Sequence, residues 1–273
     1  MASFTSSLCI ATYNWPEALQ VCFRSVLHQI IQPDEILIAD DGSKPETQQA
    51  IEAFQKRSAV PVHHVWQPDE GFQLAKIRNK AFSLAKGEYI LQIDGDLLLH
   101  PAFIRDHLEW ARRGTFVCGT RALLSPGLSR QLLIADRIRY PAFWQGGWSK
   151  KFNGLPSAPL AALAYWLERG AYRYRYVLGC NMAFWRTDLV RVNGYDERFS
   201  GWGKEDNDIA LRLINAGLDI RFLKFAGIAY HLFHAEARRT ALVTNEQILK
   251  HNLDNQVTYI TKGMSQYMKA QNQ

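Results

Sequence analysis

Short apolar runs alternate with amphipathic helical patterns over residues 8–96, and no other feature of the chain narrows its possible folds as much. The apolar runs predict β-strands over residues 8–11, 35–39, 62–66 and 89–93. Between them, periodic apolar residues predict helices that begin at Pro16, at about residue 44 and near Leu74. Such alternation builds a mostly parallel sheet with helices on both faces, so the expected fold class is α/β.

Polar clusters stand directly after three of the four predicted strands. They are Thr12-Tyr13-Asn14, Asp40-Asp41-Gly42-Ser43 and Asp94-Gly95-Asp96. Ligands of parallel sheets bind beyond the carboxyl ends of the strands. We therefore expect the three clusters to converge on one crevice at that edge of the sheet.

Length and composition fit a globular protein. The chain has 273 residues, of which 47% are hydrophobic and 21% are charged, which suits one large α/β domain with a small insertion or tail. The formal net charge of +6 suits a phosphate-bearing ligand, an anionic membrane surface or nucleic acid. Only the charge supports nucleic acid, so no nucleic-acid partner is expected.

The sequence predicts neither a signal peptide nor a membrane-spanning segment. No apolar run is long enough to cross a bilayer, and residues 1–7 lack the basic region and cleavage site of a signal peptide. The four cysteines are scattered and form no C-x-x-C pair, which indicates buried reduced thiols. The predicted location is therefore the cytoplasm.

The stretch 121–176 is rich in arginine, tryptophan and tyrosine and is interrupted by proline and glycine. Basic residues bind anionic headgroups, Trp and Tyr favour the membrane interface, and the apolar run 155–167 has the length of a surface-lying segment. A lid or acceptor-site insertion packed by its own aromatic residues explains the composition equally well. Both interpretations place this insertion near the acceptor.

Beyond the insertion, the pattern predicts a strand over 177–184 and a helix over about 206–216, which follows Gly201-Trp202-Gly203. A polar, weakly helical tail begins at about residue 245. We divide the chain into a single domain, 1–240, and a C-terminal helical tail, 241–273. The parts of the domain are a nucleotide-binding half, 1–120, the insertion or lid, 121–176, and an acceptor and catalytic half, 177–240.

Asp94 and Asp96 flank Gly95, which permits a tight turn that aims both carboxylates at one site. Close carboxylates repel one another unless a cation lies between them, and hard oxygen ligands suit Mg²⁺ or Mn²⁺ on a diphosphate. His231 and His234 follow an apolar run with H-x-x-H spacing, and a nitrogen ligand favours Mn²⁺. An Asp-Gly turn in solvent and two surface histidines are the alternative interpretation.

Glu205 and Asp206 stand at the predicted start of the second-half helix. Acidic residues there cap a helix and complement its dipole, with or without a further role. In the functional interpretation, one carboxylate accepts the proton of an acceptor hydroxyl, and Trp202 offers a flat face to a sugar ring.

Lys76 and Arg78 follow Gly71-Phe72 on a predicted helix, where they either meet phosphate charge or line a solvated face. Asp40 and Asp41 either form a simple turn or accept hydrogen bonds from a base or ribose.

These motifs, in this order, resemble those of family 2 glycosyltransferases of the GT-A fold. The three polar clusters, the first with Ala11 before it, match that family's signature, and Asp94-Gly95-Asp96 is its D-x-D. Residues 201–208 resemble the G-W-G-x-E-D motif of β4-galactosyltransferases and chondroitin-polymerase-like enzymes, and Phe72, Ala75, Lys76 and Asn79 fall where that group shows F-x-x-A-K-x-x-N. The resemblance runs from about residue 7 to 234, is interrupted over 121–176, and implies a single GT-A (Rossmann-like) domain with an aromatic and basic insertion.

Taken with the residue patterns, the resemblance assigns roles to individual residues. Asp206 is the implied catalytic base, and Asp96, His231 and His234 are the implied metal ligands. The residues implied to bind the nucleotide sugar are Thr12, Tyr13, Asn14, Asp40, Asp41, Phe72, Lys76, Arg78, Asn79, Asp94 and Gly95. Those implied to bind the sugar or the acceptor are Asn181, Trp202, Gly203 and Glu205.

The implied reaction is an inverting, Mn²⁺- or Mg²⁺-dependent transfer from a UDP-sugar to a hydroxyl of a glycan or lipid-linked saccharide. It implies cell-surface polysaccharide or lipopolysaccharide synthesis, with peripheral contact at the inner face of the cytoplasmic membrane. Lys204 replaces a glycine of the family loop, Asn207 an acid, and Leu74 a donor-binding arginine, so the sugar stays open.

Two other functions share parts of this pattern. A nucleotidyltransferase usually has a glycine-rich basic loop after the first strand, and residues 12–17 have neither feature. A non-catalytic nucleotide-sugar-binding module would have no need of Asp96, Asp206 and both histidines.

Overall fold

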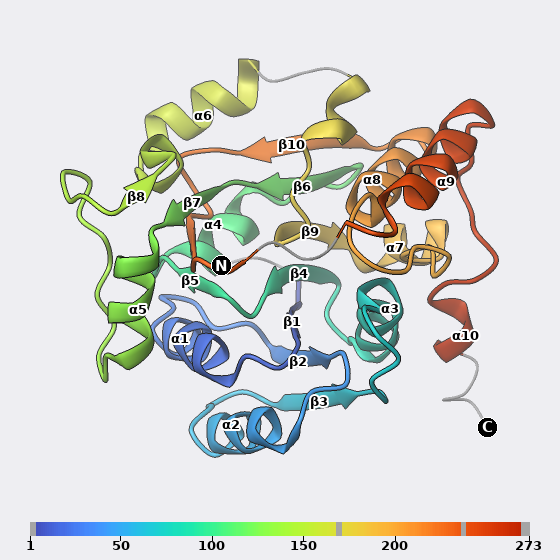
Figure 1. The fold of residues 1–273 in the computed structure, drawn as a ribbon. Helices are drawn as coiled ribbons and strands as arrows, with labels where there is room; N and C mark the ends of the chain where they lie inside the picture. The colour runs from blue at the N-terminus through green and yellow to red at the C-terminus, as the bar shows by residue number, and fades with distance from the viewer. Residues whose placement is uncertain (1–3, 168–170, 236–238, 269–273) are drawn as a thin grey trace.

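A seven-stranded sheet forms the centre of the computed structural model, which describes residues 4–167, 171–235 and 239–268. The strands, in chain order, are β1 (Ser6–Thr12), β2 (Glu35–Asp40), β3 (Val62–Trp66), β4 (Tyr89–Asp94), β6 (Thr115–Gly119), β9 (Asn181–Trp185) and β10 (Asp219–Leu223). Figure 1 shows them stacked in the order β10-β6-β9-β4-β1-β2-β3 from top to bottom. β9 runs antiparallel to β4 and β6, and the other neighbours are parallel, which confirms the predicted mostly parallel sheet.

Helices cover both faces of this sheet. On the left in Figure 1 lie α1 (Pro16–Leu27), α2 (Pro45–Gln55) and α4 (Phe103–Trp110), and on the right lie α3 (Leu74–Leu84), α7 (Arg186–Val192) and α8 (Glu205–Asn215). Successive side chains of β1 point to opposite faces, so Ile10 packs in the core cluster that includes α1 and Cys9 packs in the one that includes α3. Burial on both faces explains why the strands read as apolar runs without alternation.

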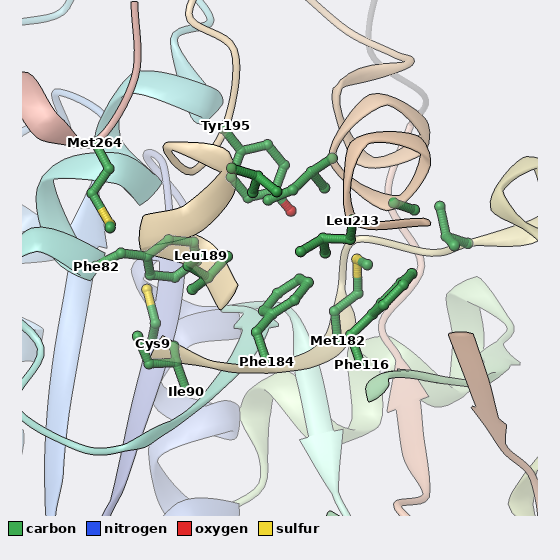
Figure 2. Packing of buried hydrophobic residues seen from close by; sticks show 14 of the residues in the cluster. Cys9, Phe82, Ile90, Phe116, Met182, Phe184, Leu189, Tyr195, Leu213 and Met264 are labelled. Atoms are coloured by element: carbon green, nitrogen blue, oxygen red, sulfur yellow. The ribbon is translucent and has the colours of Figure 1, made fainter. Parts of the chain in front are cut away.

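The C-terminal segment completes the core on the α3 face. It contains α9 (Leu242–Asp254) and α10 (Ser265–Met268), which pack against α8 and α3 respectively. Figure 2 shows Met264 beside Phe82 of α3, and Met264 is fully buried. The described part of the predicted tail is therefore packed onto the domain; residues 269–273 lie outside the described ranges.

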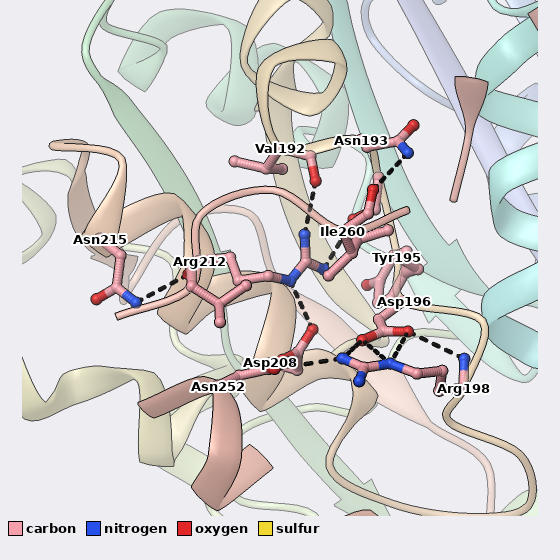
Figure 3. A network of polar contacts seen from close by, with 12 residues as sticks. Val192, Asn193, Tyr195, Asp196, Arg198, Asp208, Arg212, Asn215, Asn252 and Ile260 are labelled. Carbon is pink, nitrogen blue, oxygen red and sulfur yellow. Dashed lines mark hydrogen bonds and ion pairs between the residues drawn. The ribbon is translucent and has the colours of Figure 1, made fainter. Parts of the chain in front are cut away.

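A buried polar network fixes α8 between α7 and α9 (Figure 3). Arg212 donates to Asp208 one turn earlier at 2.7 Å and to the carbonyl oxygen of Val192 at 2.8 Å. Asn252 of α9 donates to the other oxygen of Asp208 at 2.6 Å. Both charges are fully enclosed and fully paired, so the network holds α8 in one position.

A small second sheet lies beside the carboxyl end of β4, in the order β5-β11-β7-β8. Its strands are β5 (Leu97–Leu99), β7 (Arg121–Leu124), β8 (Trp148–Ser149) and β11 (Ala229–His231). β7 and β8 come from the predicted insertion, whose other elements are α5 (Pro126–Ile134), α6 (Ala158–Leu167) and the 3₁₀ turns Lys151–Gly154 and Ala171–Tyr176. The insertion therefore begins as a strand next to the strand that carries His231.

The strand expected over 177–184 occupies only Asn181–Trp185, because the amide of Gly179 donates to a side chain, Asp206, and not to a neighbouring strand. The four cysteines are buried thiols that form no disulfide, as expected. Among the described residues, no helix combines the length and the apolar character needed to cross a membrane.

Candidate active site

The carboxyl ends of β1, β2 and β4 lie side by side, as predicted for the three polar clusters. In the register of the sheet, Thr12 pairs with Asp40 and Ala11 pairs with Asp94. Two aromatic side chains nearby, Tyr13 and Phe72, are 50% and 39% exposed. This edge of the sheet, called the crevice below, therefore combines several carboxylates with two exposed aromatic rings.

The first two clusters are tied together by hydrogen bonds. Asn14, at a positive φ of 45°, accepts from the amide of Lys44 at 2.8 Å and donates its own amide to Ser43 at 2.9 Å. Asp40 is almost fully buried, accepts from the amide of Ser43 and pairs with His64, both at 2.9 Å. In this structure Asp40 shapes the loop and has no face open to a ligand.

Asp41 connects β2 to the start of α3. Its two carboxylate oxygens accept from the side chain of Gln67 at 2.6 Å and from the amide of Gln73 at 2.8 Å. Burial raises the pKa of Asp41. The residue is enclosed but borders the crevice, where the predicted base contact would lie.

Asp96, His231 and His234 form the candidate metal centre. The imidazole Nε2 atoms of His231 and His234 lie 3.4 and 3.3 Å from one oxygen of Asp96, and one ligand atom from each residue falls within 4.8 Å of the others. The second oxygen of Asp96, Oδ1, is buried without a hydrogen-bond partner among the described residues. One carboxylate and two imidazoles with such an orphaned oxygen fit a divalent transition metal.

Protonation at this centre differs between the two histidines. Burial lowers the pKa of His231 to about 4, so its imidazole is neutral at pH 7. The hydrogen bond with Asp96 raises the pKa of His234. Burial pushes the pKa of Asp96 upward, but the hydrogen bond from His234 and the nearby positive charges outweigh it and lower the pKa.

The turn through Gly95 leaves little room for a side chain. A Cβ atom there would lie 3.0 Å from Leu19 and 3.1 Å from the carbonyl oxygen of Ala11. The amide of Gly95 donates to that same carbonyl at 2.7 Å. This close approach holds Asp94 and Asp96 on either side of the turn.

Arg78 joins Asp94 to Asp206. Its guanidinium donates to one oxygen of each carboxylate at 2.9 Å, and the Arg78 side chain is only 1% exposed. Asp206 also accepts from the hydroxyl of Tyr195 at 3.1 Å and from the amide of Gly179 at 3.0 Å. Burial raises the pKa of Asp94 to about 6, and the charge of Arg78 opposes this rise.

Several predicted ligand-binding residues lie in the framework around the crevice. Arg78 is enclosed and paired, and Lys76 pairs with the exposed Glu70 at 2.8 Å. Asn79 exchanges hydrogen bonds of 2.7 Å with the backbone of Tyr195. The predicted ligand contact of Asn79 is therefore corrected, because no part of its amide is free or exposed.

Asn181 requires the same correction. Its amide nitrogen donates to the carbonyl oxygens of Thr120 and Gly227, its amide oxygen meets His107 at 2.9 Å, and its side chain is fully buried. Asn181 ties β9 to the loops around it, and no atom of its side chain reaches the crevice.

The loop before α8 faces the same crevice. Gly203 and Lys204 have positive φ angles of 106° and 79°, and the amide of Gly201 donates to the carbonyl oxygen of Phe72 at 3.0 Å. Trp202 is 38% exposed, with the guanidinium of Arg239 5.1 Å from its ring centroid. The loop therefore presents an aromatic face next to the predicted donor residues.

α8 begins at Glu205, so both acidic residues occupy its first turn as predicted. Burial, followed by repulsion from Asp206, raises the pKa of Glu205 to about 8, and Oε2 of Glu205 has no hydrogen-bond partner in the described residues. Glu205 is therefore mostly protonated at pH 7, whereas Asp206 carries the hydrogen bonds from Arg78, Tyr195 and Gly179.

Three further residues of the site were not predicted. Tyr195 donates to Asp206, and Asn245 of α9 donates to the carbonyl oxygen of Gly203 at 2.8 Å. Arg121 lies close enough to Cys180, and then to Asp94 and Asp96, for these groups to raise its pKa against burial. Arg121 stood in the sequence only as the start of a basic stretch. Asn245 carried no local signal, because its partners lie more than 40 residues away.

The fold and the crevice define a GT-A type of structure. Among solved structures, the protein is similar to residues 1–349 of S. aureus TarS. The TM-score is 0.63, with 14% identity over 96% of this chain and 68% of that one. GalNAc-T7, solved with UDP, GalNAc and Mn²⁺, gives a TM-score of 0.63 and 14% identity over 98% of this chain and 54% of that one.

The chain belongs to glycosyl transferase family 2, whose family model matches residues 7–148. A second model, the N-terminal domain of galactosyltransferase, matches residues 163–235. Chondroitin synthase of Escherichia coli is 27% identical over 246 residues, which are 82% of this chain and 34% of that protein. Validoxylamine A glucosyltransferase of Streptomyces hygroscopicus subsp. limoneus is 25% identical over 221 residues, 78% of this chain and 48% of that protein. The chain thus spans about a third to a half of these relatives.

Proposed function

We propose that this protein is an inverting, metal-dependent glycosyltransferase that moves a sugar from a UDP-sugar to a hydroxyl of a glycan or lipid-linked saccharide. The observation that carries the proposal is the single crevice in which Asp94, beside the candidate metal centre, and Asp206 share the guanidinium of Arg78. The family match, the GT-A likeness and the UDP complex of TarS support a nucleotide-sugar donor.

Different residues of the crevice would bind the nucleoside, the metal ion, and the sugar with the acceptor. Thr12, Asp41 and Asp94 border the space for the nucleoside, and Asp96, His231 and His234 would hold Mn²⁺ or Mg²⁺. When bound, that ion would offset the negative charge of the donor diphosphate. Trp202 and Glu205 face the sugar and the acceptor, and a protonated Glu205 donates a hydrogen bond to a sugar oxygen.

Asp206 is the proposed base. Its Oδ1 atom is used by Arg78 and Tyr195, whereas Oδ2 accepts one hydrogen bond, from Gly179, among the described residues. The acceptor oxygen attacks the anomeric carbon opposite the diphosphate and passes its proton to Oδ2 of Asp206. The bond from that carbon to the diphosphate oxygen breaks, and its electron pair leaves with UDP, so the configuration inverts in one step.

The test is UDP release from a panel of UDP-sugars with oligosaccharide acceptors, with Mn²⁺ and with excess EDTA. Asp206→Asn should keep donor binding and lower turnover about 10²-fold or more, the range of general-base catalysis. Asp96→Ala should weaken Mn²⁺-dependent UDP binding. Full activity in EDTA would contradict the metal, and near-normal turnover in Asp206→Asn would contradict the base.

The predicted place of action is the inner face of the cytoplasmic membrane, in polysaccharide or lipopolysaccharide synthesis. The support is the insertion, where Ile134, Trp144 and Phe152 are 79%, 87% and 68% exposed, and α6, where Leu163 and Leu167 are 51% and 62% exposed. Such side chains next to basic residues suit an anionic lipid surface. Co-sedimentation with anionic but not neutral vesicles at low salt supports the contact; sedimentation with neither favours a lid.

A further inference from the structure

The Arg121 guanidinium borders the crevice, and among the described residues no carboxylate forms an ion pair with it. Its Nη1 atom donates to the sulfur of Cys180 at 3.3 Å, and its Nε atom is buried without a partner among the described residues. Burial raises the pKa of Cys180 to about 12, so this sulfur stays a neutral thiol and a weak acceptor. The positive charge of Arg121 is therefore not neutralised by the group that it touches.

The backbone aims Arg121 toward the candidate metal centre. Arg121 pairs with Ala229 in the parallel register of β7 and β11, and His231 lies two residues beyond Ala229. Because residues two apart on a strand point to one face, Arg121 and His231 face the same side of the small sheet. Asn153 holds this position by donating to the carbonyl oxygen of Arg121 at 3.0 Å.

The charge of Arg121 reaches both carboxylates of the D-x-D motif. Asp94 and Asp96 are both close enough for their charges to act on the Arg121 guanidinium. The other basic residues nearby are already engaged, since Arg78 binds Asp94 and Asp206 and Lys76 binds Glu70. Arg121 is thus the cation among these three that an incoming anion can bind without breaking an ion pair.

We propose that Arg121 binds the β-phosphate of the donor and stabilises the charge that this phosphate gains as the sugar leaves. The inference rests on the proposed function and names the protein's own cation for the leaving group. When the bond from the anomeric carbon to the β-phosphate oxygen breaks, the electron pair stays on that oxygen. A planar guanidinium offers paired N–H donors to such an oxygen cluster and transfers no proton, because it stays charged.

The test compares the binding of UDP and UMP, with and without Mn²⁺, by titration calorimetry. Two neutral variants, Arg121→Met and Arg121→Gln, should each lower the preference for UDP over UMP about tenfold or more, the range of one charged hydrogen bond. The effect should persist without Mn²⁺, since the guanidinium acts independently of the metal. Thermal unfolding identifies which of the two variants is folded.

Arg186→Met is the matched control, because Arg186 is a partly buried arginine whose amide donates to Glu88, just before β4 begins at the opposite end of the sheet. It should leave the preference for UDP unchanged. If a folded neutral Arg121 variant keeps the preference of the unchanged protein, the role of Arg121 is wrong while the proposed function stands. If the unchanged protein does not bind UDP, the proposed donor and the role of Arg121 are both wrong.

Discussion

The guanidinium of Arg78 donates a hydrogen bond of 2.9 Å to Asp206, which lies 128 residues further along the chain. Its other terminal nitrogen donates to Asp94, also at 2.9 Å. One buried cation therefore joins the carboxylate at the end of β4 to the carboxylate in the first turn of α8. The geometry of the proposed base depends on the geometry of the donor site.

Arg78→Met should destabilise the protein strongly, because it leaves Asp94 and Asp206 without their shared counter-charge. Removing one partner of a buried ion pair costs about 3–5 kcal/mol, and we expect the lower end of this range because both carboxylates are partly exposed. Urea unfolding near pH 8 measures the loss. Lys76→Met, on the same helix, breaks an exposed, solvent-screened pair with Glu70 and should cost far less stability than Arg78→Met. Equal losses in the two variants would contradict this account.

Gly179→Ala should displace the proposed base without altering it. A Cβ atom at Gly179 would occupy the space of the Asp206 carboxylate, whereas the amide of Gly179 now donates to Asp206 at 3.0 Å. A misplacement of about 1 Å at a reacting group lowers turnover by as much as about 10²-fold. Steady-state kinetics should show lower kcat with UDP binding retained. Gly146→Ala, with no atom within 4 Å of the added carbon, should behave as the unchanged protein.

Much of the fold could be predicted because its signals are local. The strand Val62–Trp66 and the helix Leu74–Leu84 have the bounds that the apolar patterns indicate. The meeting of three polar clusters followed from the rule that parallel strands end at one edge of the sheet. The shorter strand at Asn181–Trp185 was not foreseen, since the amide of Gly179 is taken by a side chain 27 residues away.

The framework residues escaped prediction because their partners are distant in the chain. A charged Arg78 on a helix suggests a solvated face, and only Asp94 and Asp206, 16 and 128 residues away, allow its burial. Asn79 and Asn181 look like ligand-binding amides until their partners 46 to 116 residues away are known. The grouping of Asp96, His231 and His234 could be expected from the sequence, because these residues follow apolar runs.

The affinity for Mn²⁺ should fall as the pH drops, because His234 must lose its proton before it can bind a metal. Its pKa lies above the ordinary value of 6.5, through the hydrogen bond with Asp96, so the fall should begin above pH 6.5. His231, with a pKa of about 4, adds no pH dependence in this range.

The raised pKa of His234 also makes the stability of the metal-free protein depend on pH. The pKa of His234 is raised on folding, so its charged pair with Asp96 stabilises the fold below pH 6.5 and is lost as the pH rises through the folded-state pKa. Thermal midpoints with and without Mn²⁺, measured from about pH 6 to 9, should diverge as the pH rises. His234→Gln should remove this divergence; an Mn²⁺ affinity independent of pH in the unchanged protein would contradict the assignment.

Glu205→Gln should reduce the loss of folding stability that the protein shows as the pH becomes alkaline. Burial, then repulsion from Asp206, raises the pKa of Glu205 from 4.5 to about 8, so folding binds a proton between these values and stability falls as the pH rises through them. One pKa unit corresponds to about 1.4 kcal/mol, so the variant should gain about 1 kcal/mol or more relative to the unchanged protein between pH 5 and 8.5. Urea unfolding at both pH values measures this gain. Glu52→Gln, an exposed control on α2, should show none.

α9 holds the loop that carries Trp202. The buried side chain of Asn245 donates to the carbonyl oxygens of Ser200 at 3.3 Å and Gly203 at 2.8 Å. These bonds hold a segment whose residues Gly201, Gly203 and Lys204 all have positive φ angles. Since such backbone persists only where its surroundings fix it, the acceptor face of the crevice depends on the C-terminal segment.

Asn245→Asp keeps the size of the side chain but removes the donor, and it sets a carboxylate against two carbonyl oxygens. We expect a loss of about 1–3 kcal/mol of stability, the cost of leaving buried partners unsatisfied. Because the loop faces the acceptor, the acceptor KM should rise and kcat should fall while UDP affinity stays unchanged. Glu246→Gln, which only weakens the exposed pair with Lys204 at 3.3 Å, is the neighbouring control and should leave both kinetic constants near their original values. A loss of UDP affinity in Asn245→Asp equal to the change in acceptor KM would mean that α9 supports the whole crevice and not the acceptor loop alone.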